Sequence, residues 1–150
     1  MIKSLVQATR FARDAFSGLL DLVYPPHCLV CRGQCDSYLC AECIGQITLL
    51  KPPFCYKCGG PAESFMCEDC REREYHFECA RSAGVFDGVL REAIHALKYL
   101  NHINIAEPLA GIMVDSFPDS GLAGKADLAV PIPIHVSRTV RRGFNQSEEL

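Results

Sequence analysis

The chain has 150 residues, of which 49% are hydrophobic, so it is long enough for one ordinary domain or two small ones. Its formal net charge of −3 argues against strong, sequence-independent binding to a nucleic-acid backbone, which would need a local basic patch. No apolar run approaches the roughly 18 residues of a membrane-spanning helix, and we expect no membrane span.

Residues 1–24 are expected to form an amphipathic helix that docks on the rest of the protein. Charged residues, among them Lys3 and Arg13, interrupt any apolar core of the length that a signal peptide requires. A membrane-surface helix is the less favoured alternative, because the polar face carries both signs of charge. Pro25 and Pro26 end the helix. The apolar stripe consists of Leu5, Ala8, Ala12, Phe16, Leu19, Leu20 and Val23.

Residues 25–72 contain nine of the ten cysteines, and eight of these nine form one spacing pattern that occurs twice. Each copy reads C-x2-C-x8-C-x2-C, and the second copy follows the first at an offset of 27 residues. Two C-x2-C pairs supply four thiolates, which is the closed tetrahedral ligand set of a structural zinc site. The sequence therefore predicts a double zinc ribbon with two Zn²⁺ ions. The predicted ligands are Cys28, Cys31, Cys40 and Cys43 for the first ion, and Cys55, Cys58, Cys67 and Cys70 for the second.

Other uses of these cysteines are less favoured. Iron–sulfur motifs usually crowd three cysteines together, disulfides need an oxidising compartment, and a redox C-x-x-C normally stands alone. A cross-braced arrangement of the two metals is possible, although each set of four is already compact in sequence. Gly33, Gly59 and Gly60 follow the second cysteine of a leading pair, where a positive φ closes the metal-binding turn at little cost.

The remaining cysteines, Cys35 and Cys79, are expected to be free thiols, and His27 and His76 are not needed as ligands. The metal region of about 45 residues is smaller than a hydrophobic core alone usually supports. Metal binding would supply folding free energy on the order of 10 kcal/mol per zinc ion, so chelation should unfold the region. Each four-thiolate zinc site would carry −2, which takes the metal-loaded chain to about −7.

After a charged connector at residues 71–78, the chain changes to a mixed helix and strand pattern over residues 82–150. Helices are expected at residues 89–100, with Asp87 as the N-cap, and at residues 104–117.

The strands of this part are expected at residues 82–86 and 127–132, the second as a buried strand. A turn-rich loop joins helix and strand, a basic loop covers residues 138–145, and a helix starts at residue 146. This order indicates the opening of a doubly wound α/β sheet, although one or two strands cannot make a buried parallel sheet.

Ligands of doubly wound sheets bind beyond the carboxyl ends of the strands. This rule places residues 131–135 and the following Arg138, Arg141 and Arg142 at an anion site. A guanidinium suits such a site because it can donate two parallel hydrogen bonds to phosphate oxygens. Charge alone favours the plainer interpretation that the arginines form a solvated loop.

Four further motifs accompany the eight cysteines: LLDLVYPP at Leu19–Pro26, REAIHALKY at Arg91–Tyr99, VPIPIH at Val130–His135 and RRGFNQ at Arg141–Gln146. Taken together, these motifs resemble the ComF family of double zinc ribbon proteins with a phosphoribosyltransferase-like domain. The resemblance covers most of the chain, and RRGFNQ is particularly typical of the family.

The resemblance implies a cytoplasmic bacterial protein of natural competence, in which incoming single-stranded DNA is handled alongside a helicase partner. Some relatives are associated with gluconate utilisation. The resemblance also implies a domain similar to type I phosphoribosyltransferases, which use phosphoribosyl pyrophosphate and magnesium. Residues implied to lie near the ligand are Lys98, Tyr99, Arg141, Arg142, Asn145 and Gln146.

One departure from the family is serious. Family members continue to an acidic loop rich in Thr and Gly, typically VDDV-x-TTGAT, which meets the ribose hydroxyls or metal and cradles the 5′-phosphate. Residues 1–150 contain no such segment. We therefore expect the N-terminal part of a longer protein, with an incomplete transferase-like domain at residues 82–150 that is inactive alone. Phosphoribosyl pyrophosphate and Mg²⁺ binding are expected of the full-length protein only.

Two other interpretations remain open. In the first, the chain is a non-catalytic adaptor whose ribbons dock a helicase or another protein partner. In the second, ribbon aromatics stack on single-stranded DNA, although packing of these rings in the small ribbon cores is the favoured interpretation. The aromatic candidates are Tyr38, Phe54, Tyr56 and Phe65.

Overall fold

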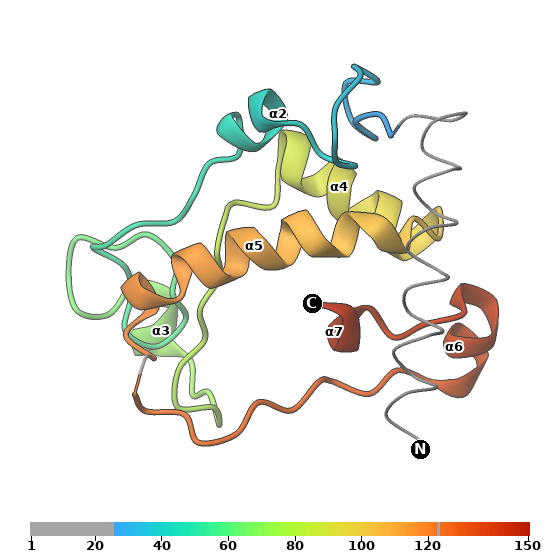
Figure 1. Ribbon diagram of the computed structural model, residues 1–150. Helices are drawn as coiled ribbons and strands as arrows, with labels where there is room; N and C mark the ends of the chain where they lie inside the picture. Colours follow the sequence, from blue (N-terminus) through green and yellow to red (C-terminus); the bar gives the residue numbers. More distant parts are fainter. Residues whose placement is uncertain (1–25, 123) are drawn as a thin grey trace.

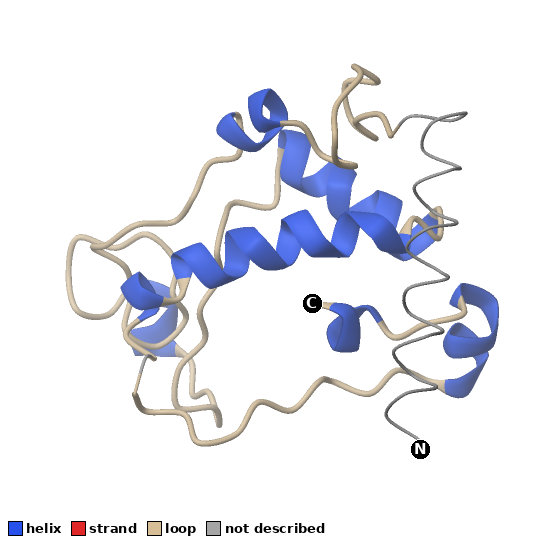
Figure 2. Ribbon diagram, viewed as in Figure 1, coloured by secondary structure: helices blue, strands red, loops and turns tan. Residues whose placement is uncertain are grey.

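The computed structural model describes residues 26–122 and 124–150, and the expected N-terminal helix at residues 1–24 lies outside them. Helices joined by loops make up this part of the chain, in which β-pairing is limited to three isolated bridges (Figure 2). No helix in it is long and apolar enough to span a membrane. The elements are α2 (Ala41–Gly45), α3 (Glu68–Glu72), α4 (Gly88–Tyr99), η1 (Ile103–Ile105), α5 (Ala106–Ser116), η2 (Pro118–Ser120), α6 (Val136–Arg142) and α7 (Gln146–Glu149).

The two longest helices, α4 and α5, confirm the helices predicted from periodicity. The predicted N-cap Asp87 accepts a hydrogen bond from the backbone N–H of Gly88 at 2.7 Å. Asn101, with φ +57°, turns the chain after α4, a backbone conformation that asparagine tolerates better than most residues. The short η1 then leads directly into α5, which buries Leu109 and Ile112.

One hydrophobic cluster joins the first metal unit to the two long helices. Leu39 of the metal unit, Leu97 of α4 and Ile105 of η1 are all less than 2% exposed. Cys28 and Cys43 belong to the same cluster, whereas the buried Cys55 and Cys70 of the second metal unit lie outside it. Figure 1 shows α2 beside the start of α4, and α3 near the end of α5. The two metal units therefore pack at different ends of the helical part.

The backbone of the first metal unit is repeated in the second at the predicted offset. The bridge between His27 and Gln34 corresponds to the bridge between Phe54 and Pro61. Helix α2 likewise corresponds to α3, each of them starting directly after the third cysteine of its set. The sequence repeat is thus a structural repeat as well as a ligand repeat.

The two strands predicted after the metal region are not formed. Residues 82–86 make a single bridge, between Gly84 and Leu49. Residues 127–132 have no ladder partner in the described part of the chain. Within them Leu128, Val130 and Ile132 are 73–79% exposed. The prediction of a buried strand is wrong, because no neighbouring strand covers these apolar side chains.

The basic loop predicted at residues 138–145 is also wrong, because most of it lies in helix α6. The His135 ring nitrogen Nδ1 accepts a hydrogen bond from the backbone N–H of Ser137 at 3.2 Å and caps the helix start. Gly143, with φ +80°, ends the helix in the left-handed conformation. The predicted helix start after Asn145 is confirmed as α7.

The positive-φ prediction holds for one glycine. Gly59 has φ +73°, but the corresponding residue of the first unit is Arg32, with φ +66°, and not Gly33. A side chain at Gly33 or Gly60 would instead approach a ligand sulfur, at 3.3 Å from Cys31 Sγ or 3.5 Å from Cys58 Sγ.

Gly59 is additionally packed against the chain that leaves the metal region. A Cβ atom at this position would lie 2.6 Å from the carbonyl oxygen of Ala80. We predict that Gly59→Ala destabilises the zinc-loaded protein by at least about 2 kcal/mol, because backbone strain and a backbone clash add together. Gly121→Ala is the matched control, since Gly121 has φ +71° with open space around it, and should cost only about 1 kcal/mol. Urea unfolding measures both, and equal costs would contradict the close contact.

Candidate metal centres and a cationic cavity

The four predicted sulfur ligands of each unit converge on one point. Within each set, all four Sγ atoms lie within 4.8 Å of one another. The Sγ–Sγ distances include 3.6 Å for Cys28 and Cys43, and 3.7 Å for Cys31 and Cys40. In the second set, Cys58 and Cys67 are 3.8 Å apart. A regular tetrahedron with Zn–S bonds of about 2.3 Å has edges of about 3.8 Å. The sulfurs are therefore spaced for one tetrahedral metal ion per set.

Backbone N–H groups face the sulfurs in both units. The N–H groups of Gly33 and Gly60 each point to the second cysteine of their unit, with N···Sγ distances of 3.4 Å. The N–H of Cys43 donates to Cys40 Sγ, and the N–H of Cys67 donates to Cys55 Sγ, both at 3.4 Å. Hydrogen bonds of this kind orient thiolate ligands and partly neutralise their charge.

The surroundings of the sulfurs lower the pKa of some ligand thiols and raise the pKa of others. N–H groups of Cys58 and Cys67 lower the pKa of the Cys55 thiol to about 6. At Cys28, burial raises the pKa of the thiol, but backbone N–H groups lower it by more. The pKa of Cys28 is therefore also lowered to about 6. Burial, together with bonds to neighbouring thiols, raises the pKa of Cys70 to about 12 and raises that of Cys43 as well. Four thiolates at this spacing need a cation to be ionised together, and a divalent zinc ion satisfies this need.

The residues that the sequence leaves out of the metal sites also lie outside the clusters. Among the described residues, the groups placed to hold a metal contain the eight predicted cysteines and no others. Cys35 instead donates its thiol hydrogen to the carbonyl oxygen of Ser37. Cys79, His27 and His76 belong to neither cluster. Each set of four forms its own site, so the cross-braced alternative is wrong.

Four of the predicted ligand residues line one small cavity of about 230 Å³. Lys98 and Tyr99 come from the end of α4, and Arg141 and Arg142 come from the end of α6. Asn101 is a fifth lining residue that sequence reasoning missed, although it is the first residue after the predicted helix. Arg138, the other arginine of the basic segment, is not part of the lining.

The other two predicted ligand residues, Asn145 and Gln146, do not line this cavity, and only Gln146 bonds to a residue that does. Gln146 Oε1 accepts a hydrogen bond from Arg142 Nη1 at 2.8 Å. The Asn145 amide donates to the carbonyl oxygen of Ile132 and to Glu148, both at 3.1 Å. Both residues therefore make hydrogen bonds within the chain, and neither is among the lining residues of this cavity.

Arg142 is the unusual residue of the cavity. Its side chain is 9% exposed, and its guanidinium lies over the Tyr99 ring at 5.4 Å from the ring centroid. Its Nε atom is buried without a hydrogen-bond partner, and within the described part of the chain it forms no ion pair with a carboxylate. A buried cation without a counter-charge is costly, and a bound anion would offset that cost.

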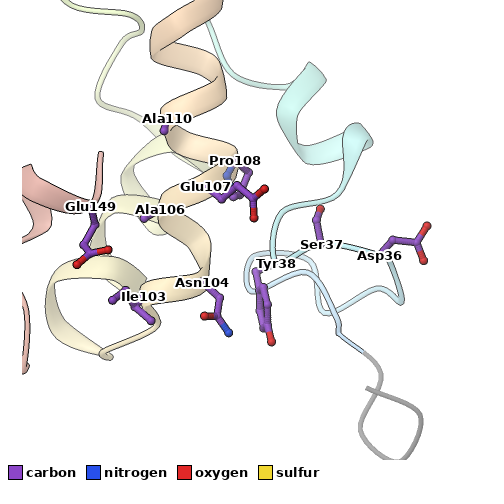
Figure 3. A pocket seen from close by; sticks show the side chains of 10 residues that line it. All are labelled: Asp36, Ser37, Tyr38, Ile103, Asn104, Ala106, Glu107, Pro108, Ala110 and Glu149. Atoms are coloured by element: carbon purple, nitrogen blue, oxygen red, sulfur yellow. The ribbon is translucent and has the colours of Figure 1, made fainter. Parts of the chain in front are cut away.

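A larger open groove of about 840 Å³ separates the first metal unit from η1 and α5. Figure 3 shows Tyr38 and Asp36 on one wall and Glu107 on the other, with Glu149 on the side of Ala106 away from Tyr38. Three carboxylates line this groove, and no lysine or arginine is among its lining residues. The groove therefore repels anions, and sequence reasoning missed it because its residues come from three distant segments.

The metal sites can be tested by exchanging single sulfur atoms. We predict that Cys31→Ser lowers the zinc content from two ions per chain to one, because a serine hydroxyl is a poor replacement for a thiolate. The matched control is Cys35→Ser, which changes a nearby cysteine that is not a ligand and should leave two ions bound. Native mass spectrometry counts the ions, and an unchanged count in Cys31→Ser would contradict the assignment.

Comparison with known proteins agrees with this geometry. Residues 19–80 match the double zinc ribbon domain family. No curated protein and no solved structure matches the chain. Residues 19–80 thus form a double zinc ribbon domain with two four-cysteine zinc sites.

Proposed function

We propose that the chain is a ComF-like protein that acts in DNA uptake during natural competence, in the cytoplasm. Its zinc ribbons give structure and contact a protein partner, such as a helicase, or single-stranded DNA. Residues 82–150 belong to a phosphoribosyltransferase-like domain that binds phosphoribosyl pyrophosphate together with Mg²⁺. The double zinc ribbon at residues 19–80 and the motifs quoted above support this proposal.

The observation that carries the proposal is the meeting of two distant motifs at one cavity. REAIHALKY contributes Lys98 and Tyr99, and RRGFNQ contributes Arg141 and Arg142, more than 40 residues later. Three cations around one small space form an anion site, and the buried Arg142 lacks a carboxylate partner among the described residues. The cavity of about 230 Å³ is smaller than usual small-molecule pockets, so it suits a phosphate group of a larger ligand.

The zinc ions themselves are proposed to be structural. All four positions of each tetrahedron are taken by cysteine sulfur, so no position is open for substrate or water.

An alternative function is a zinc-ribbon adaptor that docks a helicase or other protein without catalysis. The exposed Leu128, Val130 and Ile132 favour it, because apolar side chains exposed in one segment often mark an interaction surface.

The anion site can be tested with inorganic pyrophosphate, which carries the phosphate chemistry of the proposed ligand. We predict that Arg141→Gln weakens pyrophosphate binding to the zinc-loaded chain about tenfold, because a charge-assisted hydrogen bond is lost. Arg138→Gln is the matched control, since it removes the same charge from the same helix outside the cavity, and should change binding less than twofold. Isothermal titration calorimetry measures both.

Either of two results would contradict the anion site. The first is an equal effect of the two substitutions, which would indicate general charge attraction. The second is a wild-type chain that does not bind pyrophosphate, which would leave the adaptor as the better proposal.

A further inference from the structure

The second metal unit exposes an aromatic pair that a small ribbon would be expected to bury. The rings of Tyr56 and Phe65 stack at a centroid distance of 4.9 Å with an interplanar angle of 14°. Phe65 is 71% exposed, so Tyr56 covers one face of its ring and the other face is open to solvent. The favoured prediction that ribbon aromatics pack inside is wrong for Phe65, and it holds for Tyr38, which packs on the core of the first unit.

A fixed arginine lies beside this pair. The guanidinium of Arg81 lies over the rings of Phe54 and Tyr56, at 5.0 and 5.9 Å from their centroids. Arg81 Nε donates to the carbonyl oxygen of Ser120 at 2.7 Å, and Nη1 donates to the carbonyl oxygens of Tyr56 and Ala80. Its Nη2 atom donates to no acceptor in the part of the chain that the structure describes. The side chain is therefore held in place with one donor group left for a ligand.

These residues line one open groove of about 450 Å³ between the second metal unit and the loop after η2. Lys125 brings a second cation to the groove, and Glu63 is the one carboxylate of its lining. Proteins bind single-stranded nucleic acid with aromatic rings beside cations, because the bases stack on the rings and the phosphates contact the cations.

We infer that this groove binds single-stranded nucleic acid, with an unpaired base stacked on the open face of Phe65. Lys125 and Arg81 Nη2 then meet the neighbouring phosphate. The inference rests on the single-strand contact of the proposed function and assigns it to these residues. It does not depend on the cationic cavity between α4 and α6. The groove beside Tyr38 is unsuited to the same task, because Asp36 and Glu107 would repel a phosphate.

The charges of the chain set the character of this binding. A metal-loaded chain near −7 repels DNA at long range, so stacking carries most of the affinity and few phosphates are neutralised. For one or two phosphate contacts to a single strand, the slope of log K against log salt is about −0.7 to −1.4. Such a shallow slope separates this mode of binding from general attraction to a basic surface.

The test uses the zinc-loaded full chain and a fluorescein-labelled 20-mer of thymidylate, followed by fluorescence anisotropy at low and moderate salt. Phe65→Ala should weaken binding at least fivefold, since stacking on one aromatic ring is lost. Phe65→Trp should retain it. Phe77→Ala is the matched control, because Phe77 is an exposed aromatic residue outside the groove, and should leave the affinity unchanged within twofold.

Zinc content and circular dichroism show whether each variant is folded, and Phe65→Leu replaces Phe65→Ala if the latter is not.

Lys125→Gln should reduce the steepness of the slope of log K against log salt by about 0.7, because one phosphate contact is lost.

The inference is overturned if the wild-type chain does not bind the oligonucleotide, or if Phe65→Ala and Phe77→Ala have equal effects. Binding of a labelled proline decamer without oligonucleotide binding would also overturn it and assign the groove to a protein partner. Pyrophosphate binding is measured on the same preparations, so a failure of the cationic cavity is distinguishable from a failure of this groove.

Discussion

Tetrahedral coordination by four thiolates is the constraint on which the rest of this structure depends. Each metal unit contains a five-residue helix and one isolated bridge, which are too little to fold alone. Two of the ligands, Cys28 and Cys43, are also members of the hydrophobic cluster that includes α4 and α5. The first zinc ion therefore stabilises the helical part as well as its own unit. The second ion holds the aromatic groove, because Phe54, Tyr56 and Phe65 lie between and beside its ligands in the chain.

The metal sites and the candidate binding surfaces thus have different tasks. The zinc sites are closed and stabilise the fold, whereas the proposed ligand binding involves two other places on the surface. One is the cationic cavity where α4 and α6 end, with the buried Arg142 as its central group. The other is the aromatic groove of the second unit, where Arg81 ties the metal unit to the loop at Ser120. Both are suited to phosphate-containing ligands, through different side chains.

Local chemistry decides which features could be predicted from the sequence. The cysteine spacing identifies both metal sites because four ligands within sixteen residues leave little conformational choice. The Asp87 cap is equally local. The buried strand at residues 127–132 fails because burial depends on a partner strand, which an apolar run cannot supply by itself. Helix α6 is missed because its start depends on an unusual histidine cap.

The sequence pattern also does not predict which individual side chains are buried and which are exposed. Arg138 and Arg142 belong to one basic segment, yet only Arg142 is buried, because α6 turns that side toward Tyr99. In the same way Tyr38 and Phe65 occupy corresponding positions of the repeat, offset by 27 residues. Tyr38 packs beside α4 and α5, whereas Phe65 has no such neighbour and remains exposed. The surroundings of each copy decide its role.

X-ray absorption spectroscopy at the zinc edge reports directly on whether both zinc sites are closed by four sulfur atoms. Our prediction is two zinc ions per chain and one coordination shell of four sulfur atoms at about 2.3 Å. A shell that contains nitrogen or oxygen, or a protein that holds iron in place of zinc, would contradict it.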